Sequence, residues 1–454
     1  MRSGRETEGR RPFAGRAIVV GASISGLLAA RVVAPHVEQV LVFERDTLGE
    51  AAGPRRMTPQ GHHLHMLLKG GDEAIERMVP GFLATIERAG GTRVRPGVDF
   101  ALGSELGFPP KWDSGIVQSV QSRWLLEHCL RRQVLAQTPN VEVRTETTVR
   151  GVEYDARLNR IVGVRVEGAS EATLETDLVI DATGRGETTL RWLRALGLPL
   201  PEIEEVMIDF GYSSAVLELD AAPTRDWLGI GVANIPGPGA RGGVVLPIEN
   251  GLHILSCGGR GASRPPENKD DLIEFSRTLP QPELYETLRR AQFMTPVTPA
   301  LFPSNRFRHY ERLATLPVGL WPIGDAIVSV NPGYGQGMTS AALQCEALSA
   351  TLIERTDEDI ATLGQRFLTR AAEVGLMPWR QANYGDFFYP TTIGDRGMFS
   401  DDEMSYRMQV QLAGVRDEEV RTLTTRVGHL LIPFERLMEP DVRARVAAAL
   451  ATSE

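Results

Sequence analysis

Cysteine, lysine and long apolar runs are all scarce in this sequence of 454 residues. Its three cysteines, Cys129, Cys257 and Cys345, are far apart and lack CxxC spacing, which indicates neither a disulfide framework nor a zinc site. The cytoplasm is therefore the expected compartment. No apolar run reaches the ~18 residues of a membrane span. The first sixteen residues contain five Arg and two Glu but no apolar segment, so residues 1–16 are predicted to be a disordered tail and not a secretory signal.

The composition is that of an ordinary globular protein, with 42% hydrophobic and 24% charged residues. A chain of this length favours two or three structural units, and its net charge of −9 argues against nucleic-acid binding as the main function. Residues 17–205 and 301–353 alternate strand-like and helix-like segments. Residues 206–300 contain short runs of strand length, which predict an inserted antiparallel or mixed sheet. Residues 354–454 are predicted to be helical, with helices over Ile360–Val374, Asp401–Ala413 and Asp417–Met438.

The first motif lies near the N-terminus. The β-branched run Ala17–Val20 leads into the glycine turn Gly21–Gly26, and the helix-like stretch Leu27–Val33 follows. A second strand, Val40–Phe43, ends in Glu44, eighteen residues after the last glycine of the turn. This order of strand, glycine turn, helix, strand and acid predicts a dinucleotide-binding site in a doubly wound α/β domain.

Each residue type in this motif has a physical role. Gly21 makes the tight turn, and Gly26 lets the helix pack closely on the strand. The helix N-terminus faces a pyrophosphate, and Glu44 can accept a hydrogen bond from a ribose hydroxyl. Ser23 stands where the middle glycine usually is, so the backbone is slightly less open to the phosphate.

A second motif lies about three hundred residues later. The strand-like segment Leu320–Ala326 contains Gly324-Asp325, and the glycine-rich turn Asn331–Gly337 then leads into the small-residue helix Met338–Ala350. A carboxylate at the end of a strand can hold a polyol hydroxyl. A helix N-terminus can hold an anion, such as the pyrimidine edge of a reduced flavin. Taken alone, the pattern fits a turn without a ligand equally well.

Together the motifs resemble the FAD-dependent monooxygenases of the para-hydroxybenzoate hydroxylase superfamily over most of residues 17–353. Gly21–Gly26 with Glu44 is similar to the ADP-binding fingerprint of that family. Gly324-Asp325 is similar to its GD motif. The segment Ser122–Leu130 is similar to an arginine-containing helix start that contacts FAD, with Arg123 as the arginine. An arginine at a helix start opposes the helix dipole, which favours an anionic partner.

Within the superfamily, the sequence is most similar to bacterial polyketide epoxidases of polyether antibiotic biosynthesis. The similar segments are Pro59-Gln-Gly-His-His-Leu-His65, Asp181-Ala-Thr-Gly-Arg-Gly186 and the Asn-Pro-Gly-Tyr-Gly run that begins at Asn331. Close relatives of these epoxidases hydroxylate other scaffolds, so both epoxidation and hydroxylation stay open.

The resemblance implies an α/β fold with a doubly wound, Rossmann-like FAD domain, an inserted mixed-sheet substrate domain and a C-terminal helical region. It implies non-covalent FAD, whose C4a-hydroperoxide transfers one oxygen atom from O2 to an apolar polyketide, terpenoid or aromatic secondary metabolite. The implied FAD contacts are Gly21, Ser23, Ser25, Gly26, Glu44, Arg45, Arg123, Val149, Asp325, Pro332, Gly335, Gln336, Gly337 and Met338. Many family members have Asp-Gly where this chain has Thr183-Gly184. The electron donor is therefore NADPH or NADH, acting directly or through a separate flavin reductase.

Three other patterns bear on the chemistry. His62, His63 and His65 are dense enough to suggest a metal, but no carboxylate or cysteine at a suitable spacing completes a site, and no metal is expected. We expect His63 and His65 to orient the substrate or the peroxide through hydrogen bonds. Gly237–Gly242 matches GxGxxG but precedes a strand, which predicts a hairpin. The aromatic-rich segment Pro378–Tyr389 either closes over the substrate or is a docking patch.

Other functions share some of these sequence features. A flavin oxidase or dehydrogenase would share every FAD motif. A flavin halogenase is disfavoured because the six tryptophans form no Trp-x-Trp pair and lysine occurs only at Lys69, Lys111 and Lys269. A non-catalytic nucleotide-binding module would bind no flavin. A hydrolase is excluded because Ser25 stands where a nucleophile elbow around Ser23 needs glycine.

Overall fold

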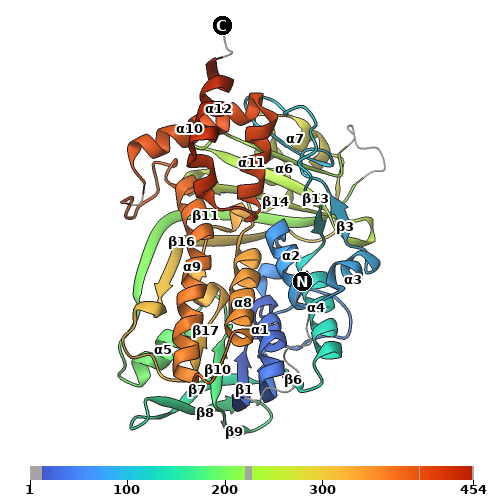
Figure 1. Cartoon of the computed structure of the whole chain (residues 1–454). Helices are drawn as coiled ribbons and strands as arrows, with labels where there is room; N and C mark the ends of the chain where they lie inside the picture. The colour runs from blue at the N-terminus through green and yellow to red at the C-terminus, as the bar shows by residue number, and fades with distance from the viewer. Residues whose placement is uncertain (1–12, 220–226, 398, 452–454) are drawn as a thin grey trace.

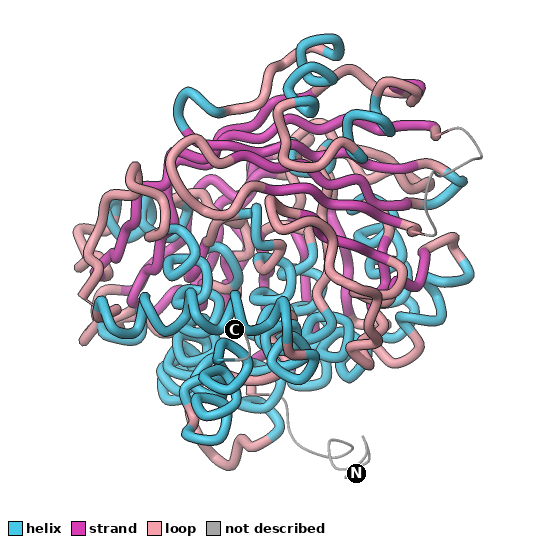
Figure 2. Tube along the Cα trace, turned by 90° about the horizontal axis from the view of Figure 1, so that it is seen from above, coloured by secondary structure: helices cyan, strands magenta, loops and turns pink. Residues whose placement is uncertain are grey.

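The computed structural model describes residues 13–219, 227–397 and 399–451, so residues 1–12 of the predicted tail lie outside the described residues. The prediction of a disordered tail as far as residue 16 is wrong at its end, because residues 14–16 belong to the strand Ala14–Val20. The chain forms a parallel sheet with helices, a second and larger sheet, and a group of C-terminal helices, as Figure 1 shows from bottom to top. Seen from above in Figure 2, the helices gather mainly on one side of the strands of the second sheet. This is the α/β architecture that the sequence predicts.

The first sheet is entirely parallel and has the strand order β17-β10-β1-β2-β6. Its central strands are buried runs of β-branched and aromatic residues, as expected for a sheet covered on both faces. The strands are β1 (Ala14–Val20), β2 (Val37–Phe43), β6 (Val141–Arg144), β10 (Leu178–Asp181) and β17 (Leu320–Pro322).

Helices and a small sheet cover this parallel sheet. Helices α1, α8 and α9 lie side by side in front of it in Figure 1, with α1 also against α4. The antiparallel sheet β7-β8-β9 adds Val152, Ile161 and Val164 to the same core. The elements are α1 (Ile24–Val33), α4 (Arg123–Gln137), α5 (Thr188–Ala195), α8 (Gly337–Ile353), α9 (Ile360–Asp386), β7 (Thr148–Asp155), β8 (Arg160–Glu167) and β9 (Glu171–Glu175).

The second sheet has the order β18-β16-β11-β14-β13-β12-β4, with β15 also on β11. Its pairs are antiparallel except β12 with β4, so the sheet is mixed. Its strands are β4 (Phe100–Gly103), β11 (Glu202–Glu218), β12 (Gly229–Ala233), β13 (Arg241–Pro247), β14 (His253–Arg260), β15 (Gln292–Phe293), β16 (Thr298–His309) and β18 (Val328–Ser329). Strand β4 comes from within the range expected for the FAD domain. The GxGxxG-like segment Gly237–Gly242 connects the antiparallel pair β12 and β13, as predicted.

Short elements complete these two parts of the molecule. Helices α6 and α7 cover the outer face of the second sheet, where Leu272, Phe275 and Leu284 pack on Leu255. The remaining elements are α2 (Lys69–Met78), α3 (Phe82–Arg88), α6 (Lys269–Arg277), α7 (Glu283–Leu288), β3 (Thr92–Val94) and β5 (Gln118–Val120).

The C-terminal region is helical but is divided differently from the prediction. Helix α9 continues twelve residues beyond Val374, through Pro378. Helix α10 (Asp401–Arg416) matches its prediction and runs three residues further. The helix predicted over Asp417–Met438 is wrong: α11 (Glu418–Gly428) ends where Leu430 takes a left-handed φ of 54°, and a short 3-10 turn and α12 (Pro440–Ala451) follow. No helix in the described ranges is long and apolar enough to cross a membrane.

Candidate functional site

The glycine turn between β1 and α1 needs glycine at two positions. Gly21 has a φ of 103°, and a Cβ there would lie 2.7 Å from the Ala182 carbonyl oxygen. A Cβ at Gly26 would lie 1.8 Å from the Gly21 carbonyl oxygen. Ser23, the N-cap of α1, uses its side chain for no capping hydrogen bond. The first N–H groups of α1 therefore face the space beyond the strand ends.

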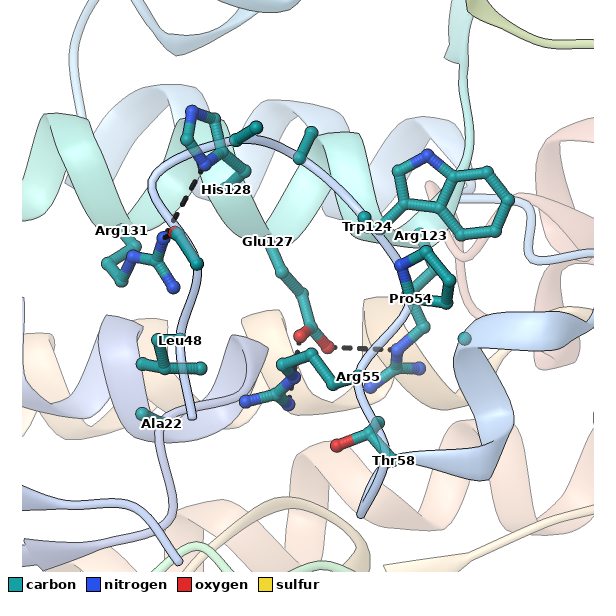
Figure 3. A pocket seen from close by; sticks show the side chains of 15 residues that line it. Ala22, Leu48, Pro54, Arg55, Thr58, Arg123, Trp124, Glu127, His128 and Arg131 are labelled. Atoms are coloured by element: carbon teal, nitrogen blue, oxygen red, sulfur yellow. Dashed lines mark hydrogen bonds and ion pairs between the residues drawn. The ribbon is translucent and has the colours of Figure 1, made fainter. Parts of the chain in front are cut away.

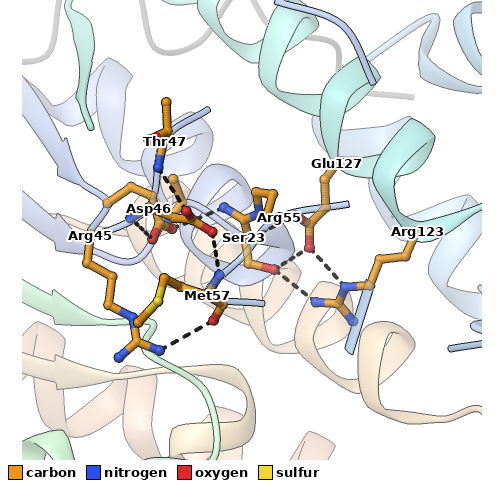
Figure 4. A network of polar contacts seen from close by, with 10 residues as sticks. Ser23, Arg45, Asp46, Thr47, Arg55, Met57, Arg123 and Glu127 are labelled. Carbon is orange, nitrogen blue, oxygen red and sulfur yellow. Dashed lines mark hydrogen bonds and ion pairs between the residues drawn. The ribbon is translucent and has the colours of Figure 1, made fainter. Parts of the chain in front are cut away.

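Glu44, at the end of β2, braces this turn. Its carboxylate accepts hydrogen bonds from the N–H groups of Ala22 and Asp46, both at 3.0 Å, and lies 3.2 Å from the Arg55 guanidinium. The carboxylate is buried, and one acceptor position of about four stays available for a ribose hydroxyl. Figure 4 shows this part of the polar network, which Arg45 borders by donating to the Met57 carbonyl at 3.4 Å.

Arg123 is largely covered by the fold, since only 11% of its side chain is exposed. It begins α4 and donates from Nε to Glu127 (2.9 Å) and from Nη2 to the Ser23 hydroxyl (2.9 Å). Ser23 in turn donates to Glu127 at 2.6 Å, and Arg55 lies 2.9 Å from the second Glu127 oxygen. The helix start and the glycine turn are thus tied together through side chains.

A cleft opens beside this network. Figure 3 shows α4 along one wall and the loop around Pro54 along another, with the guanidinium groups of Arg55 and Arg123 both beside the Glu127 carboxylate. Fifteen residues line the cleft: Ala22, Leu48, Gly49, Ala51, Ala52, Gly53, Pro54, Arg55, Thr58, Gly61, Arg123, Trp124, Glu127, His128 and Arg131.

Asp325 lies in a 3-10 turn directly after β17. Ser25, in the first turn of α1, is its neighbour, because a Cβ on Gly324 would lie 3.1 Å from the Ser25 Cβ. Burial raises the pKa of the Asp325 carboxyl, while the charges of Arg123, Arg185 and Arg308 act in the opposite direction. Arg308 donates to the backbone carbonyls of residues 325 and 326, both at 3.1 Å. No described side chain donates to the Asp325 carboxylate, which leaves it for a polyol hydroxyl.

The second glycine turn ends at the N-terminus of α8. Gly335 has a left-handed φ of 67°, Gln336 is the N-cap, and α8 begins at Gly337. The N–H groups of Gly337 and Met338 belong to the first helical turn and have no intrahelical acceptor. A Cβ on Gly337 would lie 3.8 Å from Asp325 Oδ1. The helix start and the Asp325 carboxylate therefore face the same space.

His63 and His65 lie between this region and the second sheet. His63 is 2% exposed, its Nδ1 is 3.0 Å from the Ser214 hydroxyl, and its ring contacts Tyr212 edge-on at 4.6 Å. Burial, with His62 as a smaller cause, lowers its pKa to about 4. Burial and the charge of Arg123 lower the pKa of His65 to about 3. His65 Nδ1 donates to the His63 carbonyl (3.0 Å), so its Nε2 presents a lone pair.

The residues of the cleft fit the ADP half of FAD. Arg55, Arg123 and Arg131 bring three positive charges against two from Glu44 and Glu127, an excess that suits a pyrophosphate. The buried Arg55 Nε has no hydrogen-bond partner among the described residues. The α1 N-terminus adds its dipole. In the part of the chain that the structure describes, no group of three or more His, Cys, Asp or Glu could hold a metal.

The structure brings most of the predicted contact residues together. Of the predicted contacts, only Arg123 lines the cleft. Ser23 and Glu44 adjoin it through their bonds to Arg123 and Arg55, and Gly337 lies near Asp325. Arg45 and Val149 do not line the cleft. Val149 is at the start of β7, two residues after Thr147, which donates its N–H to the Glu44 carbonyl (2.9 Å). Sequence reasoning missed Arg55, Glu127 and Arg131. Glu127 carried a signal, since it lies four residues after Arg123 on a helix.

Comparisons with known proteins identify a family and a fold. Residues 17–190 match the family described as FAD dependent oxidoreductase. Protein Rv3254 of Mycobacterium tuberculosis is 32% identical over 384 residues, which cover 82% of this chain and 80% of that protein. This level of identity over this length places the two chains in one family.

Several solved structures share the fold at low sequence identity. The flavin-dependent brominase Bmp2 superposes with a TM-score of 0.67 at 15% identity, covering 96% of this chain and 98% of that one. The probable FAD-dependent monooxygenase pqsL of Pseudomonas aeruginosa gives 0.62 at 17% identity, over 82% and 95%. Klebsiella pneumoniae HpxO, complexed with FAD and uric acid, gives 0.58 at 16% identity, over 96% and 97%.

Proposed function

Since the chain is an FAD-dependent oxidoreductase of the same family as the mycobacterial Protein Rv3254, we propose that it is a monooxygenase. It transfers one oxygen atom from O2 to an apolar secondary metabolite, a polyketide, terpenoid or aromatic compound, by epoxidation or hydroxylation. FAD, when bound and reduced, supplies the activation of O2. Glu44, Ser23 and Arg123 hold its ADP half, and Asp325 with the start of α8 holds its flavin half.

The observation that carries this proposal is the inner face of the second sheet. Phe210 and Tyr212 of β11 are half-buried there and stack at 5.7 Å between ring centroids. Phe302 of β16 pairs with Phe210 across the strands and is also half-buried. Tyr212 contacts His63, so this aromatic face adjoins the histidines and, through Arg123, the FAD region. Such a face suits an apolar, partly planar substrate.

Polar groups on the same face position the substrate without acid–base work. His63, Ser214 and Ser256 form a hydrogen-bonded row, with 3.0 Å for each contact. Because the pKa values of His63 and His65 are lowered to about 4 and 3, both rings are neutral near neutral pH. His65 Nε2 then accepts a hydrogen bond and cannot donate one. Oxygen transfer to an electron-rich double bond or ring needs only placement and exclusion of water.

NADPH or NADH is the proposed electron donor. Thr183, which stands where many superfamily members have the Asp of the middle motif, donates its hydroxyl to Asp181 at 2.7 Å and is bound to Thr188 at 2.8 Å. Its side chain is therefore committed to the fold. Consumption of NADPH and NADH by the purified protein, with and without a flavin reductase, distinguishes direct reduction from reduction by a partner enzyme.

The decisive experiment is turnover under ¹⁸O2 with candidate metabolites, followed by mass spectrometry of the product. One heavy oxygen per product supports the proposal, and an oxidised product without it assigns the protein to the oxidases. A product that carries bromine or chloride when halide is added would assign it to the halogenases.

A double variant tests the role of the histidines. His63→Phe with His65→Phe is expected to uncouple the reaction, so that NADPH consumption yields hydrogen peroxide in place of product. His62→Phe is the matched control, because this neighbouring ring is exposed to solvent. Unchanged coupling in the double variant would remove both histidines from the mechanism.

A further inference from the structure

Asp386 is a fully buried carboxylate that the proposed mechanism does not use. It is the last residue of α9 and is 0% exposed. Four side chains donate to it. Tyr334 Oη (2.8 Å), Asn331 Nδ2 (2.9 Å) and Arg260 Nη2 contact Oδ1, and Asn305 Nδ2 (2.7 Å) contacts Oδ2. Both carboxylate oxygens are therefore hydrogen-bonded inside the fold.

These donors come from three different parts of the fold. Arg260 is on β14 and Asn305 on β16, both in the second sheet. Asn331 and Tyr334 belong to the turn that precedes α8. Asp386 therefore joins α9, the second sheet and this turn at one point. The segment Pro378–Tyr389 is accordingly a docked segment, with Trp379 and Asp386 buried, and not an open lid.

The turn is held by Asp386 as well as by its own internal hydrogen bonds. Its internal bonds are the Asn331 side chain to the Gly333 N–H (2.9 Å) and two backbone bonds of 3.2 and 3.0 Å. The hydrogen bonds to Asp386 hold Asn331 at the beginning of the turn and Tyr334, the residue before Gly335. Burial and the nearby Asp386 charge raise the pKa of Tyr334 well above its usual value, so the phenol keeps the proton that it donates.

Asp386 and Arg260 also form an ion pair close to the turn. The Arg260 side chain is 6% exposed and stacks on the Tyr389 ring at 3.8 Å. Without Asp386 its positive charge would be buried and uncompensated. A positive charge near a reduced, anionic flavin would favour reduction, so the Asp386 carboxylate would lower the potential of a flavin bound at this turn.

We propose that Asp386 is a positioning residue of the flavin site, which holds the Asn331–Gly335 turn against the cofactor and neutralises Arg260 beside it. This inference rests on the proposed placement of the α8 start at the flavin pyrimidine edge. It predicts two separable effects, one on FAD affinity through geometry and one on flavin potential through charge.

Three variants of the full-length protein separate these effects. Asp386→Asn removes the charge but keeps the shape, and is expected to weaken FAD binding several-fold. It should also shift the two-electron flavin equilibrium toward the reduced form on the order of tenfold, which is about 30 mV. Arg260→Gln with Asp386→Asn restores neutrality, so the potential should return while the affinity stays low. Tyr334→Phe removes one donor without a change in charge and should lower the affinity alone.

Glu358→Gln is the matched control, at a residue two positions before α9 begins. It breaks the pair with Arg366 near the other end of α9, about 30 Å from Asp386 along the helix. FAD affinity is measured by flavin fluorescence on reconstitution, the potential by dye-coupled photoreduction without oxygen, and stability by thermal unfolding. The control should lower stability but change neither affinity nor potential.

The outcomes decide the inference. If Asp386→Asn lowers only the unfolding temperature, as the control does, Asp386 is merely structural and the proposal is wrong. If that variant does not fold, unchanged FAD affinity in Tyr334→Phe overturns it instead. The measurements of FAD affinity and flavin potential need neither a substrate nor O2. If both quantities change as expected but the protein transfers no oxygen, only the proposed function is refuted, and the inference about Asp386 stands.

Discussion

The sharpest prediction concerns Gly26, where the structure leaves no room for a methyl group. A Cβ at this position would lie 1.8 Å from the Gly21 carbonyl oxygen and 2.9 Å from its carbon, although real Cβ contacts essentially never fall below 3.0 Å. Both atoms are backbone, so no side chain can rotate away. In Gly26→Ala, helix α1 therefore has to move more than 1 Å away from the glycine turn. This movement displaces the helix N-terminus that is proposed to face the pyrophosphate.

The magnitude follows from the cost of overpacking. An extra methyl group forced into a packed site costs about 1–3 kcal/mol. If FAD binding restores the native turn, the same energy is taken from the binding free energy, and Kd should rise roughly 5-fold to 150-fold. The apoprotein, in which the turn stays relaxed, should lose less than this amount of its unfolding free energy.

The assay is titration of the apoprotein with FAD, followed by flavin fluorescence, beside urea unfolding. Gly53→Ala is the matched control, because Gly53 lines the same cleft, yet a Cβ there would meet nothing within 4 Å. The control should bind FAD within about twofold of the wild type. Native FAD affinity in Gly26→Ala would show that the α1 N-terminus does not hold the cofactor.

Two further predictions use titratable groups. Asp325→Asn should weaken FAD retention roughly tenfold or more, since a hydrogen bond to a charged group contributes about 1.5–3 kcal/mol. The substitution removes a carboxylate whose pKa is raised by burial, so the apoprotein of this variant should be no less stable than the wild type. FAD retention is measured by the flavin-to-protein absorbance ratio after gel filtration, and stability by thermal unfolding. Full retention of FAD would refute the role of Asp325 in cofactor binding. The pKa of His63 is lowered to about 4 in the fold, so below its unfolded value near 6.5 the unfolded state binds more protons. Stability from this site is complete above pH 6.5 and falls on acidification, by about 2 kcal/mol between pH 7 and 5. Between pH 7 and pH 5, the free energy of unfolding in urea should therefore fall by about 2 kcal/mol less in His63→Phe than in the wild type. An equal fall in both proteins would show that His63 is not buried as a neutral ring.

Local sequence patterns predicted the elements that depend on neighbouring residues. The turn Gly21–Gly26, the acid Glu44 and the start of α8 each follow from residue types within a few positions, and the structure has them where the patterns indicated. The prediction of a continuous helix over Asp417–Met438 was wrong because Leu430 adopts a left-handed backbone conformation, which a leucine in the sequence does not indicate. A break of that kind is set by tertiary packing and not by propensity.

Side chains that act across the fold carried no such signal. Arg55 lies in a loop without periodicity, and its partner Glu127 follows 72 residues later. Asp386 and Arg260 are 126 residues apart. Only the packing of α9 against the second sheet brings the latter pair together. Contacts of this range depend on the whole topology, which a single sequence does not reveal.

Both cofactor motifs lie within reach of the Arg123 side chain. This position explains why the helix start at Arg123 accompanies the two glycine motifs in the sequence. Its guanidinium donates to Ser23 of the first turn, and its charge influences the pKa of Asp325 in the second and of His65 beside the substrate sheet. One charge therefore acts on both halves of the proposed FAD site and on the ring proposed to orient the substrate. For the same reason, loss of activity in an Arg123 variant could not be assigned to any one of these contacts. The residues around it, which can each be changed separately, are the ones that separate cofactor binding from oxygen transfer.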